Sequence, residues 1–316
     1  RRIWAFTERA YRLAAEAGRR HDVGFRATGS VLAAGSDLEA ERLSRSHDLL
    51  LEDGVESAFL EHAAANARIG SVGFPAALVV SIGGTIDPVR LVRALATESG
   101  ATVLEGARVT DLEPGSGRTR IVLEGGGEVR TGRVLIAANA YLPQLRPELS
   151  HVVRPVRAQM LATAPAPPTL AAPVYSHHGY VYLRQRCDGR VMVGGARHLH
   201  RDLEVGYDDQ TTPALQADLE AYVATHFPTF AGLEVERRWA GTMGFSPDGL
   251  PVIGAVPGLE DVFYAAGFTG HGMGYALRFG ELAARTLLGE SDPDLDVFTA
   301  DRMKANAEAP AGALVR

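Results

Sequence analysis

The clearest pattern along the chain is a short apolar run, followed by a glycine-rich segment and then by a stretch with helical spacing. The apolar run Val262–Ala266 predicts a buried strand. The later stretch Ala276–Leu288 predicts a helix that ends before Gly289. The segment between them reads Gly267-Phe268-Thr269-Gly270-His271-Gly272-Met273-Gly274-Tyr275. The pattern therefore predicts a glycine loop between a strand and the N-terminus of a helix.

The composition of this loop indicates a ligand site. Its four glycines let a flat or anionic ligand approach the backbone closely. The first turn of the following helix has N–H groups without intrahelical partners, and it carries the positive end of the helix dipole. Such a site favours negative charge. The alternative is an ordinary strand-to-helix turn, which needs one or two glycines rather than four.

Hydrophobic periodicity predicts further helices. Ser36 and Glu39 form a capping-box pattern, and Asp87 is the expected N-cap of a helix with Pro88 at its first position. The helices are expected at 4–18, 36–54, 89–99 and 211–227.

Strands are predicted where β-branched and aromatic residues lie between turn residues. The expected positions are a strand pair within 24–34, single strands at 74–82, 101–105, 107–112 and 133–141, and hairpins that join 119–123 to 128–131 and 180–185 to 190–195. The segment 164–168 is too rich in proline for regular structure, and the tail from Ala305 is expected to fray. Mixed strands and helices predict an α/β fold with a nucleotide-binding domain and an antiparallel substrate sheet.

Composition and charge narrow the classes of function. The chain has 316 residues, of which 46% are hydrophobic and 22% are charged, so it can bury a sizeable core. A net charge of −6 without a basic block argues against nucleic-acid binding. No apolar run approaches the roughly 20 residues that a membrane helix needs. The single cysteine, Cys187, excludes an internal disulfide and fits a reducing compartment, so we expect a cytoplasmic protein.

Common catalytic motifs are missing from the sequence. It contains no Ser/His/Asp order, no H-E-x-x-H, no P-loop and no cysteine cluster, so no metal site is predicted.

A longer ordered pattern leads into the glycine loop. Trp239-Ala240-Gly241 is followed by Pro247-Asp248-Gly249-Leu250-Pro251-Val252-Ile253-Gly254 and then by Gly267-Phe268-Thr269-Gly270-His271-Gly272. This order resembles the C-terminal flavin signature of the D-amino-acid-oxidase-like (DAO) FAD-dependent oxidoreductases. Within that family the chain is most similar to the gamma-glutamylputrescine oxidase and glycine oxidase type. Weaker likeness extends over nearly the whole chain.

The resemblance implies a particular division of the chain. The family fold has an FAD/NAD(P)-binding Rossmann-like domain and an antiparallel-sheet substrate domain. We expect a substrate-domain segment at 1–83, an FAD-binding segment at 84–149, the substrate-binding domain at 150–235 and the C-terminal FAD-binding segment at 236–316. The family also begins with a G-x-G-x-x-G turn that holds the FAD pyrophosphate. That spacing is absent here, so the Rossmann-like domain is expected to be N-terminally incomplete.

The resemblance also implies residues that bind the cofactor. The backbone of Val109 is expected at the adenine, and Ala137, Ala138 and Asn139 are expected beside the pyrophosphate. The alternatives are strand core for Val109 and a tight strand exit for the other three residues. The remaining expected cofactor-binding residues are Gly241, Gly267, Phe268, Thr269, Gly270, His271, Gly272 and Met273.

Two residues are candidates on the substrate side. Tyr182 matches a substrate-facing tyrosine of glycine oxidases, and by strand alternation Tyr180 and Arg184 share its face. The alternative is that these tyrosines are ordinary sheet aromatics. His271 is expected either to contact the flavin or to cap its helix.

The implied activity is FAD-dependent oxidation of a C–N bond in an amine or amino acid. A hydride passes to the flavin, and the resulting imine hydrolyses. Positions that hold a carboxylate-binding Lys or Arg, or an oxygen-activating Lys, in related oxidases are occupied here by Gly274, Met243 and Met192. The electron acceptor is therefore oxygen or unknown, and the absence of a cysteine near Gly241 predicts non-covalent FAD. The alternatives are a non-catalytic remnant or subunit, and an FAD-dependent 2-hydroxy-acid dehydrogenase of the same fold.

Overall fold

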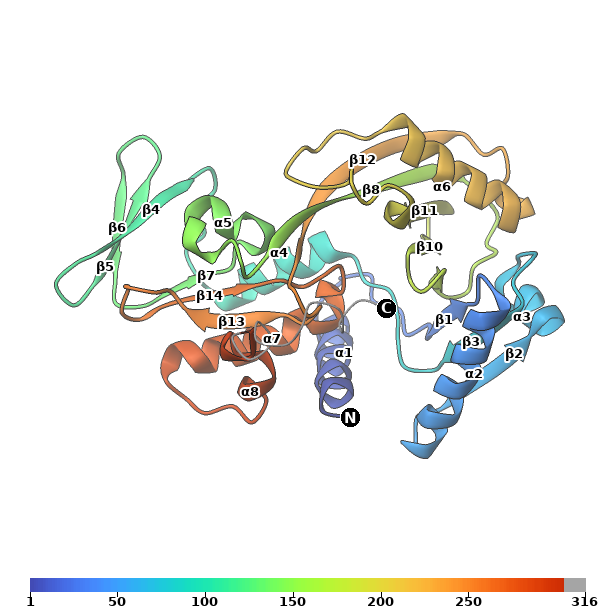
Figure 1. The fold of residues 1–316 in the computed structure, drawn as a ribbon, viewed down its shortest axis with the longest axis horizontal. Helices are drawn as coiled ribbons and strands as arrows, with labels where there is room; N and C mark the ends of the chain where they lie inside the picture. The colour runs from blue at the N-terminus through green and yellow to red at the C-terminus, as the bar shows by residue number, and fades with distance from the viewer. Residues whose placement is uncertain (304–316) are drawn as a thin grey trace. The chain divides into compact units, whose positions relative to one another are not determined.

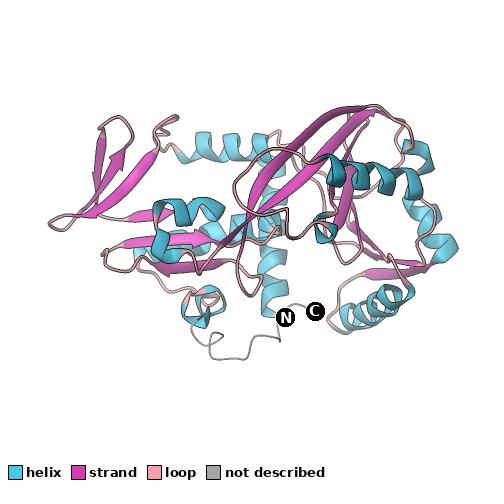
Figure 2. Ribbon diagram, turned by 45° about the horizontal axis from the view of Figure 1, so that its top comes forward, coloured by secondary structure: helices cyan, strands magenta, loops and turns pink. Residues whose placement is uncertain are grey.

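The computed structural model describes residues 1–303, and these form two compact units. Unit 1 comprises residues 1–14, 95–156 and the described residues from 242 onward, and unit 2 comprises residues 15–94 and 157–241. Helices and strands are mixed along the chain (Figure 1, Figure 2), which confirms the predicted α/β class. The predicted assignment of segments to FAD-binding and substrate-binding domains stays a prediction. The expected fraying from Ala305 lies outside the described residues.

An eight-stranded sheet lies mainly in unit 2, with the strand order β12-β8-β11-β10-β9-β1-β3-β2. Its pairing is antiparallel between β8, β11, β10 and β9 and between β1, β3 and β2, whereas β1 and β9 are parallel. The strands are β1 Ser30–Ala33, β2 Ser57–Glu61, β3 Ala76–Val80, β8 Arg154–Pro165, β9 Val174–Ser176, β10 Val181–Gln185, β11 Arg190–Gly195 and β12 Val235–Phe245.

One face of this sheet forms the main core of unit 2. Alternate residues such as Leu183, Val191 and Val193 pack with apolar residues of α3 (His62–Ile69) and α6 (Pro213–His226). A second cluster joins β3 to α2 (Asp37–Glu52). Tyr182 and Arg184 alternate with the buried residues of β10 and therefore belong to the opposite face.

Unit 1 contains a small sheet, β13-β14-β7, covered by helices. β14 (Val262–Ala266) runs parallel to β7 (Val134–Ile136) and antiparallel to β13 (Val252–Ala255). α7 (Gly272–Leu288) packs Phe279 and Leu282 in a cluster with Phe6 of α1 (Arg2–Arg20) and with α8 (Leu295–Phe298).

A separate three-stranded sheet in unit 1 is a simple meander. It contains β4 (Val109–Pro114), β5 (Thr119–Leu123) and β6 (Glu128–Thr131), which confirms the predicted hairpin. The remaining helices are α4 Pro88–Ser99, α5 Leu142–Leu145, and the short 3-10 helices Asn139–Tyr141, Pro147–Leu149, Arg197–Leu199 and Pro228–Phe230. None of the helices within residues 1–303 has the length and hydrophobicity needed to cross a bilayer.

Both predicted caps form. The Asp87 carboxylate accepts hydrogen bonds from the amides of Val89 and Arg90, at 3.0 and 3.1 Å. The Ser36 hydroxyl accepts one from the Glu39 amide at 3.2 Å. The Glu39 side chain accepts from the Gly35 amide, so it binds one residue before the position that a complete capping box would use.

Five predicted elements differ in the structure. The strand predicted at 133–141 is shorter: β7 ends at Ile136, and Asn139–Tyr141 forms a 3-10 helix. The strand pair within 24–34 is wrong: only β1 forms, because β1 pairs with β3 and β9 while Arg26 makes an isolated bridge to Thr85. The strand at 101–105 is wrong, since these exposed residues have no regular structure. β8 continues to Pro165 in the proline-rich segment because the Ala164 amide donates to the Glu234 carbonyl. α7 begins at Gly272 rather than Ala276, so four loop residues, 272–275, belong to its first turn.

Candidate functional site

The ends of two parallel strands bring two of the predicted binding segments together in unit 1. β7 and β14 are neighbours in register, with Ile136 opposite Tyr264. The segments 137–139 and 267–270 therefore leave the sheet at adjacent carboxyl ends, where ligands bind in open α/β sheets. Asn139 Oδ1 accepts a hydrogen bond from the Gly267 amide at 3.0 Å. The structure thus brings together Ala137–Asn139 and the glycine loop.

Thr269 is held in a conformation that β-branched residues rarely adopt. Its φ is 48°, in the left-handed region. Its amide donates to the Gly244 carbonyl at 2.8 Å, and its hydroxyl donates to the Gly267 carbonyl at 3.1 Å. The Ser246 amide donates to the same hydroxyl at 3.2 Å. Several bonds therefore determine a strained backbone, as is found at ligand sites.

The glycines in and beside the loop differ in what a larger side chain would meet there. Gly267 has φ 75°, and a Cβ there would lie 2.8 Å from Ser246 Cβ. A Cβ at Gly244 would lie 2.5 Å from Asn139 Oδ1. Gly270 also has φ 75°, whereas a Cβ at Gly274 would meet no atom within 4 Å. Packing and backbone conformation therefore require Gly244 and Gly267, while Gly274 leaves open space.

The N-terminus of α7 presents backbone donors. Within residues 1–303, the amides of Gly270, Gly272 and Met273 donate to no hydrogen-bond acceptor, whereas the Gly274 amide donates to the His271 carbonyl at 3.0 Å. These amides lie at the positive end of a helix of 17 residues. They therefore suit the negative charge of a bound ring or anion.

The His271 side chain does not cap the helix. His271 is the N-cap residue of α7 and is exposed, yet within the described residues its imidazole makes no capping hydrogen bond. The alternative in which it caps α7 is therefore wrong, and its contact with flavin stays a prediction.

One buried hydroxyl near the loop in sequence was missed by the sequence reasoning. Thr242 Oγ1 is buried and has no hydrogen-bond partner among the described residues. Burying a hydroxyl without a partner costs free energy, which a bound polar ligand would offset. The signal for Thr242 was its place directly after the Trp-x-Gly motif. The donors of the loop fit a flat ligand with polar edges, such as a flavin ring.

The other predicted cofactor residues occupy different settings. Val109 lies at the start of β4 with 37% of its surface exposed, so the alternative of strand core is wrong. Ala137 is exposed and Ala138 is half-buried. Phe268 is half-buried and stacks edge-on against Phe279, at 5.1 Å between ring centroids. Gly241 is exposed and belongs to unit 2.

An ion pair fixes the Pro-Asp-Gly turn that precedes the loop. Arg302 Nε and Nη2 donate to the two oxygens of Asp248 at 2.7 and 3.1 Å, and the Leu250 amide donates to the same carboxylate. Burial raises the pKa of Asp248, but the bonds from Arg302 and Leu250 outweigh it and hold the pKa below its ordinary value. Sequence reasoning missed Arg302, because no motif links it to a turn so far away in the chain.

The substrate-side candidate Tyr182 lies in unit 2. It pairs with Tyr175 of β9 and with Gly194 of β11, and the two tyrosine rings are 6.3 Å apart. A Cβ at Gly194 would lie 2.5 Å from Tyr182 Cε2, so the ring needs a glycine beneath it. Burial raises the pKa of Tyr182, so its hydroxyl stays a donor at neutral pH. Tyr180, by contrast, precedes β10, stacks on His198, and accepts a hydrogen bond from Arg201.

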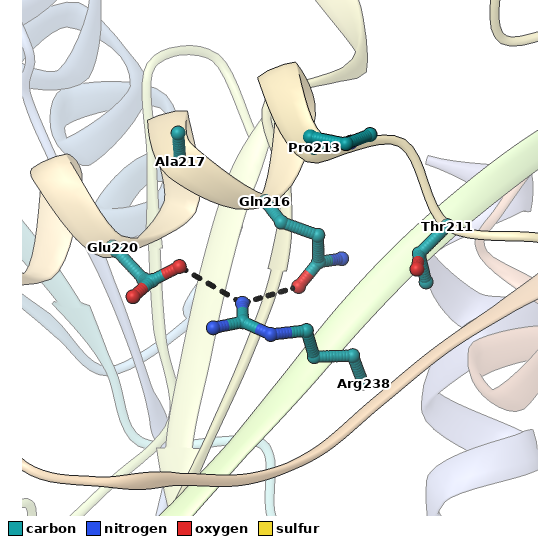
Figure 3. Close-up of a pocket in the computed structure, with 6 residues that line it drawn as sticks. All are labelled: Thr211, Pro213, Gln216, Ala217, Glu220 and Arg238. Carbon is teal, nitrogen blue, oxygen red and sulfur yellow. Dashed lines mark hydrogen bonds and ion pairs between the residues drawn. The ribbon is translucent and has the colours of Figure 1, made fainter.

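A pocket of about 340 Å³ lies elsewhere in unit 2, beside α6 (Figure 3). Its one basic residue is Arg238, whose Nη1 is 2.9 Å from both Gln216 Oε1 and Glu220 Oε1. Its charge is therefore already compensated, and no residue predicted as a site lines the pocket. The lining residues are Thr211, Pro213, Gln216, Ala217, Glu220 and Arg238.

Two known oxidoreductases are similar in sequence to most of this chain. The chain is 25% identical over 310 residues to the probable oxidoreductase OrdL of Rhizobium meliloti (strain 1021), covering 94% of this chain and 69% of that protein. It is 26% identical over 249 residues to gamma-glutamylputrescine oxidoreductase of Escherichia coli (strain K12), covering 74% of this chain and 55% of that protein. The matches thus span about half to two thirds of these relatives' lengths.

A solved structure shows the same fold. The glycine oxidase from Geobacillus kaustophilus matches with a TM-score of 0.80 at 23% identity, covering 91% of this chain and 78% of that one. The model of the family described as FAD dependent oxidoreductase (DAO) matches residues 1–286. Together with the glycine loop at the carboxyl ends of β7 and β14, this match shows that the chain belongs to the DAO family of FAD-dependent oxidoreductases.

Proposed function

We propose that this chain carries out FAD-dependent oxidation of a C–N bond in an amine or amino acid. The observation that carries the proposal is the strained loop at the end of β14, with the donors of Gly270, Gly272 and Met273 at the N-terminus of α7. Family membership supports FAD as the cofactor. The names of two relatives, gamma-glutamylputrescine oxidoreductase and glycine oxidase, support an amine or amino-acid substrate.

The chain's own residues would hold FAD without a covalent bond. Backbone amides at 270–273 would donate to the ring, and the helix dipole would stabilise negative charge on it. Asn139 would keep Gly267 in place through its 3.0 Å bond, and the Thr242 hydroxyl would supply a further polar contact. The small side chains of Ala137 and Ala138 would leave room for the pyrophosphate, and the backbone of Val109 would lie at the adenine. Phe268, Thr269, His271 and Gly241 complete the proposed set.

The chemistry needs orientation and exclusion of water more than a dedicated acid–base pair. Bound FAD would supply the hydride acceptor. The carbon beside nitrogen would lose a hydride, the nitrogen lone pair would form the C=N bond, and the nitrogen would release a proton to water to give the imine. Water then adds to the imine and releases a carbonyl compound and ammonia or an amine. Tyr182 would orient the substrate, which must bind as the neutral amine. His271 is the second substrate-side candidate. The acceptor that reoxidises the flavin is oxygen or another oxidant.

We also propose a cytoplasmic location. The support is the single cysteine, Cys187, which is exposed and fits a reducing compartment.

Purification with added FAD tests the proposal. We expect a yellow protein whose flavin is released on denaturation, and bleaching of the flavin by members of an amine and amino-acid panel with a dye as acceptor. A panel of 2-hydroxy acids runs in parallel. A protein that retains no flavin would support the non-catalytic alternative, and a flavoprotein bleached only by hydroxy acids would contradict the C–N assignment.

A further inference from the structure

The large sheet of unit 2 ends at β2, which has a neighbouring strand on one side only. β2 pairs with β3 along its whole length, and within residues 1–303 no strand lies on its other side (Figure 1). A free strand edge presents backbone N–H and C=O groups that can pair with a further strand. β2 is therefore an open position in the backbone hydrogen bonding of this sheet.

One hydrogen bond at the start of β2 fixes which of its residues bond to β3. The Ser81 amide donates to the Glu56 carbonyl at 3.2 Å, in the same register as the strand pairing that follows. Because bonded pairs recur at every second residue of an antiparallel ladder, Ala58 and Leu60 also bond to β3.

The remaining residues of β2 direct backbone groups to the free edge. These groups are the N–H and C=O of Ser57, the N–H and C=O of Phe59, and the N–H of Glu61. The Glu61 carbonyl is at the N-cap of α3, so it serves the first turn of that helix. The edge thus offers an alternating set of donors and acceptors.

The opposite edge of the same sheet is protected by charge, whereas β2 is not. That edge is β12, which carries three consecutive charged residues, Glu236, Arg237 and Arg238. Charged side chains on an edge strand oppose pairing with another chain. In β2 the only charged residue is the last one, Glu61, and the strand has no proline and no bulge. The two edges differ as expected if β2 alone receives a further strand.

The free edge of β2 is complementary to a second copy of itself. In an antiparallel pair centred on Phe59, the two Phe59 residues exchange both of their backbone hydrogen bonds. The Glu61 amide of each copy then donates to the Ser57 carbonyl of the other. Every residue contact occurs twice, as a two-fold axis requires.

Apolar side chains meet across this pair. Phe59 lies on the α2 face of the sheet, where it packs against the cluster between β3 and α2. In the pair the two Phe59 rings are neighbours, and aromatic cross-strand pairs stabilise sheets. On the other face Ala58, which is exposed, is opposite the half-buried Leu60 of the other copy.

The charged residues favour the same register. With Phe59 at the centre, Glu56 is opposite His62 and Glu61 is opposite Ser57, so no like charges are directly opposed. A pair centred on Glu61 instead places two carboxylates opposite each other, which is unfavourable. Centring on Phe59 also uses more of the outward backbone groups.

α2 adds an exposed apolar residue beside the edge. His47 Nδ1 lies 2.9 Å from Ser57 Oγ, so this side of α2 covers β2. Leu51 follows one helical turn later on the same side and is 52% exposed. Stable interfaces bury about 1,200–2,000 Å² in total, more than one short strand supplies, so the flanking helices contribute.

We propose that this chain forms a homodimer in which β2 pairs antiparallel with β2 of a second copy, centred on Phe59. The pairing continues the sheet of unit 2 across two molecules. The inference does not depend on the proposed oxidation, because none of its residues belongs to the proposed flavin or substrate set.

Glu61→Pro tests the pairing with little disturbance of the fold. Glu61 has a φ of −75°, which proline can adopt, and its amide points away from β3. Sedimentation of the full chain over a concentration series should show a wild-type dimer. Glu61→Pro should raise its dissociation constant by at least about 10-fold, because each dimer loses two hydrogen bonds. Glu61→Ala keeps the amide and should dimerise like wild type.

A second variant covers the case in which proline disturbs the strand. Ala58→Lys adds a charge at an exposed position of the edge and should also weaken the dimer. Circular dichroism shows whether each variant keeps the wild-type fold, and Ala58→Lys decides if Glu61→Pro does not. A wild-type chain that stays monomeric up to about 100 μM would assign the edge to a different partner and overturn the inference. So would a dimer whose affinity the deciding variant leaves unchanged.

Disulfide formation tests the register. The single native cysteine is exposed, so the variants are made with Cys187→Ser. Ser57→Cys in one copy and Glu61→Cys in the other form a directly opposed pair, with Cα atoms about 5.5 Å apart, within disulfide range. Oxidation of a mixture of the two variants should give the linked heterodimer. Absence of this heterodimer, or equal linking of each variant with itself, contradicts the register.

Discussion

At the scale of single residues, the segments that follow β7 and β14 each hold one non-glycine residue in the left-handed region of backbone conformation. Asn139 and Thr269 have φ values of 44° and 48°. Asn tolerates this region because its side chain can bond locally, whereas a β-branched Thr does so only when neighbours fix it. The bonds to Gly267, Gly244 and Ser246 are those neighbours. The loop is thus preorganised rather than shaped by a ligand.

Asn139→Ala should destabilise the protein. The variant removes the acceptor of the Gly267 amide and leaves a non-glycine residue at a positive φ. We expect the free energy of unfolding in urea to fall by about 1–3 kcal/mol. Asn139→Gly relieves the backbone but also lacks the acceptor, so its loss should be smaller. Unchanged unfolding of Asn139→Ala would show that the bond adds no stability.

The Asp248–Arg302 pair predicts a dependence of stability on pH. The pKa of Asp248 is lower in the folded chain than in the unfolded one, so its contribution is present above the ordinary carboxyl pKa of about 4. It is lost as the pH falls through the folded value. Asp248→Asn should therefore be less stable than wild type at pH 7, by about 1–3 kcal/mol, and the difference should shrink in acid.

Urea unfolding at pH 7 and at pH 3 measures this effect. Asp202→Asn, at an exposed residue, serves as the control and should unfold like wild type at both values. A difference between Asp248→Asn and wild type that stays constant with pH would argue that packing, rather than charge, holds the turn.

At the scale of elements, two glycines at the start of α7 have opposite requirements. Gly270, just before the helix, has φ 75°, and Gly274, inside it, has open space around its Cβ position. Gly270→Ala should lower the free energy of unfolding by about 1 kcal/mol. Gly274→Ala should leave it unchanged or raise it by up to about 1 kcal/mol, because Ala favours helix.

Flavin titration separates stability from binding for the same two variants. If the ring lies close to this turn, Gly274→Ala should weaken flavin affinity without loss of stability. Full affinity in both variants would place the ring away from the turn.

The elements with strong local signals were predictable. The run 262–266, the hairpin of β10 and β11 and the cap of α4 by Asp87 follow from alternation and side-chain chemistry, and the structure confirms them. The glycine loop followed from the residue pattern, whereas the bond between Asn139 and Gly267 was not predicted. Arg302 and the bond between Thr269 and Gly244 could not be predicted, because they depend on contacts between distant segments. The prediction of a strand at 101–105 was wrong, because apolar residues form a strand only where a neighbouring strand can pair with them.

At the scale of the whole molecule, ligand binding should be visible as stability. A cofactor that binds only the folded chain raises the free energy of unfolding, by about 2.7 kcal/mol at a hundred times its dissociation constant. We expect the unfolding temperature to rise with FAD concentration, and to rise less with riboflavin, which lacks the adenine and pyrophosphate. An unfolding temperature that is independent of FAD would contradict cofactor binding by this chain.

The parallel pairing of β7 with β14 also has a consequence for biosynthesis. Residues 134–136 leave the ribosome long before residues 262–266, and the second segment of unit 2, residues 157–241, is made between them. β7 therefore has no β14 to pair with until residues 262–266 have been synthesised. Closing so long a loop carries an entropy cost and slows folding. Synthesis of residues 157–241 therefore delays the pairing of β7 with β14. During that delay the unpaired strand is prone to aggregation, which chaperones limit.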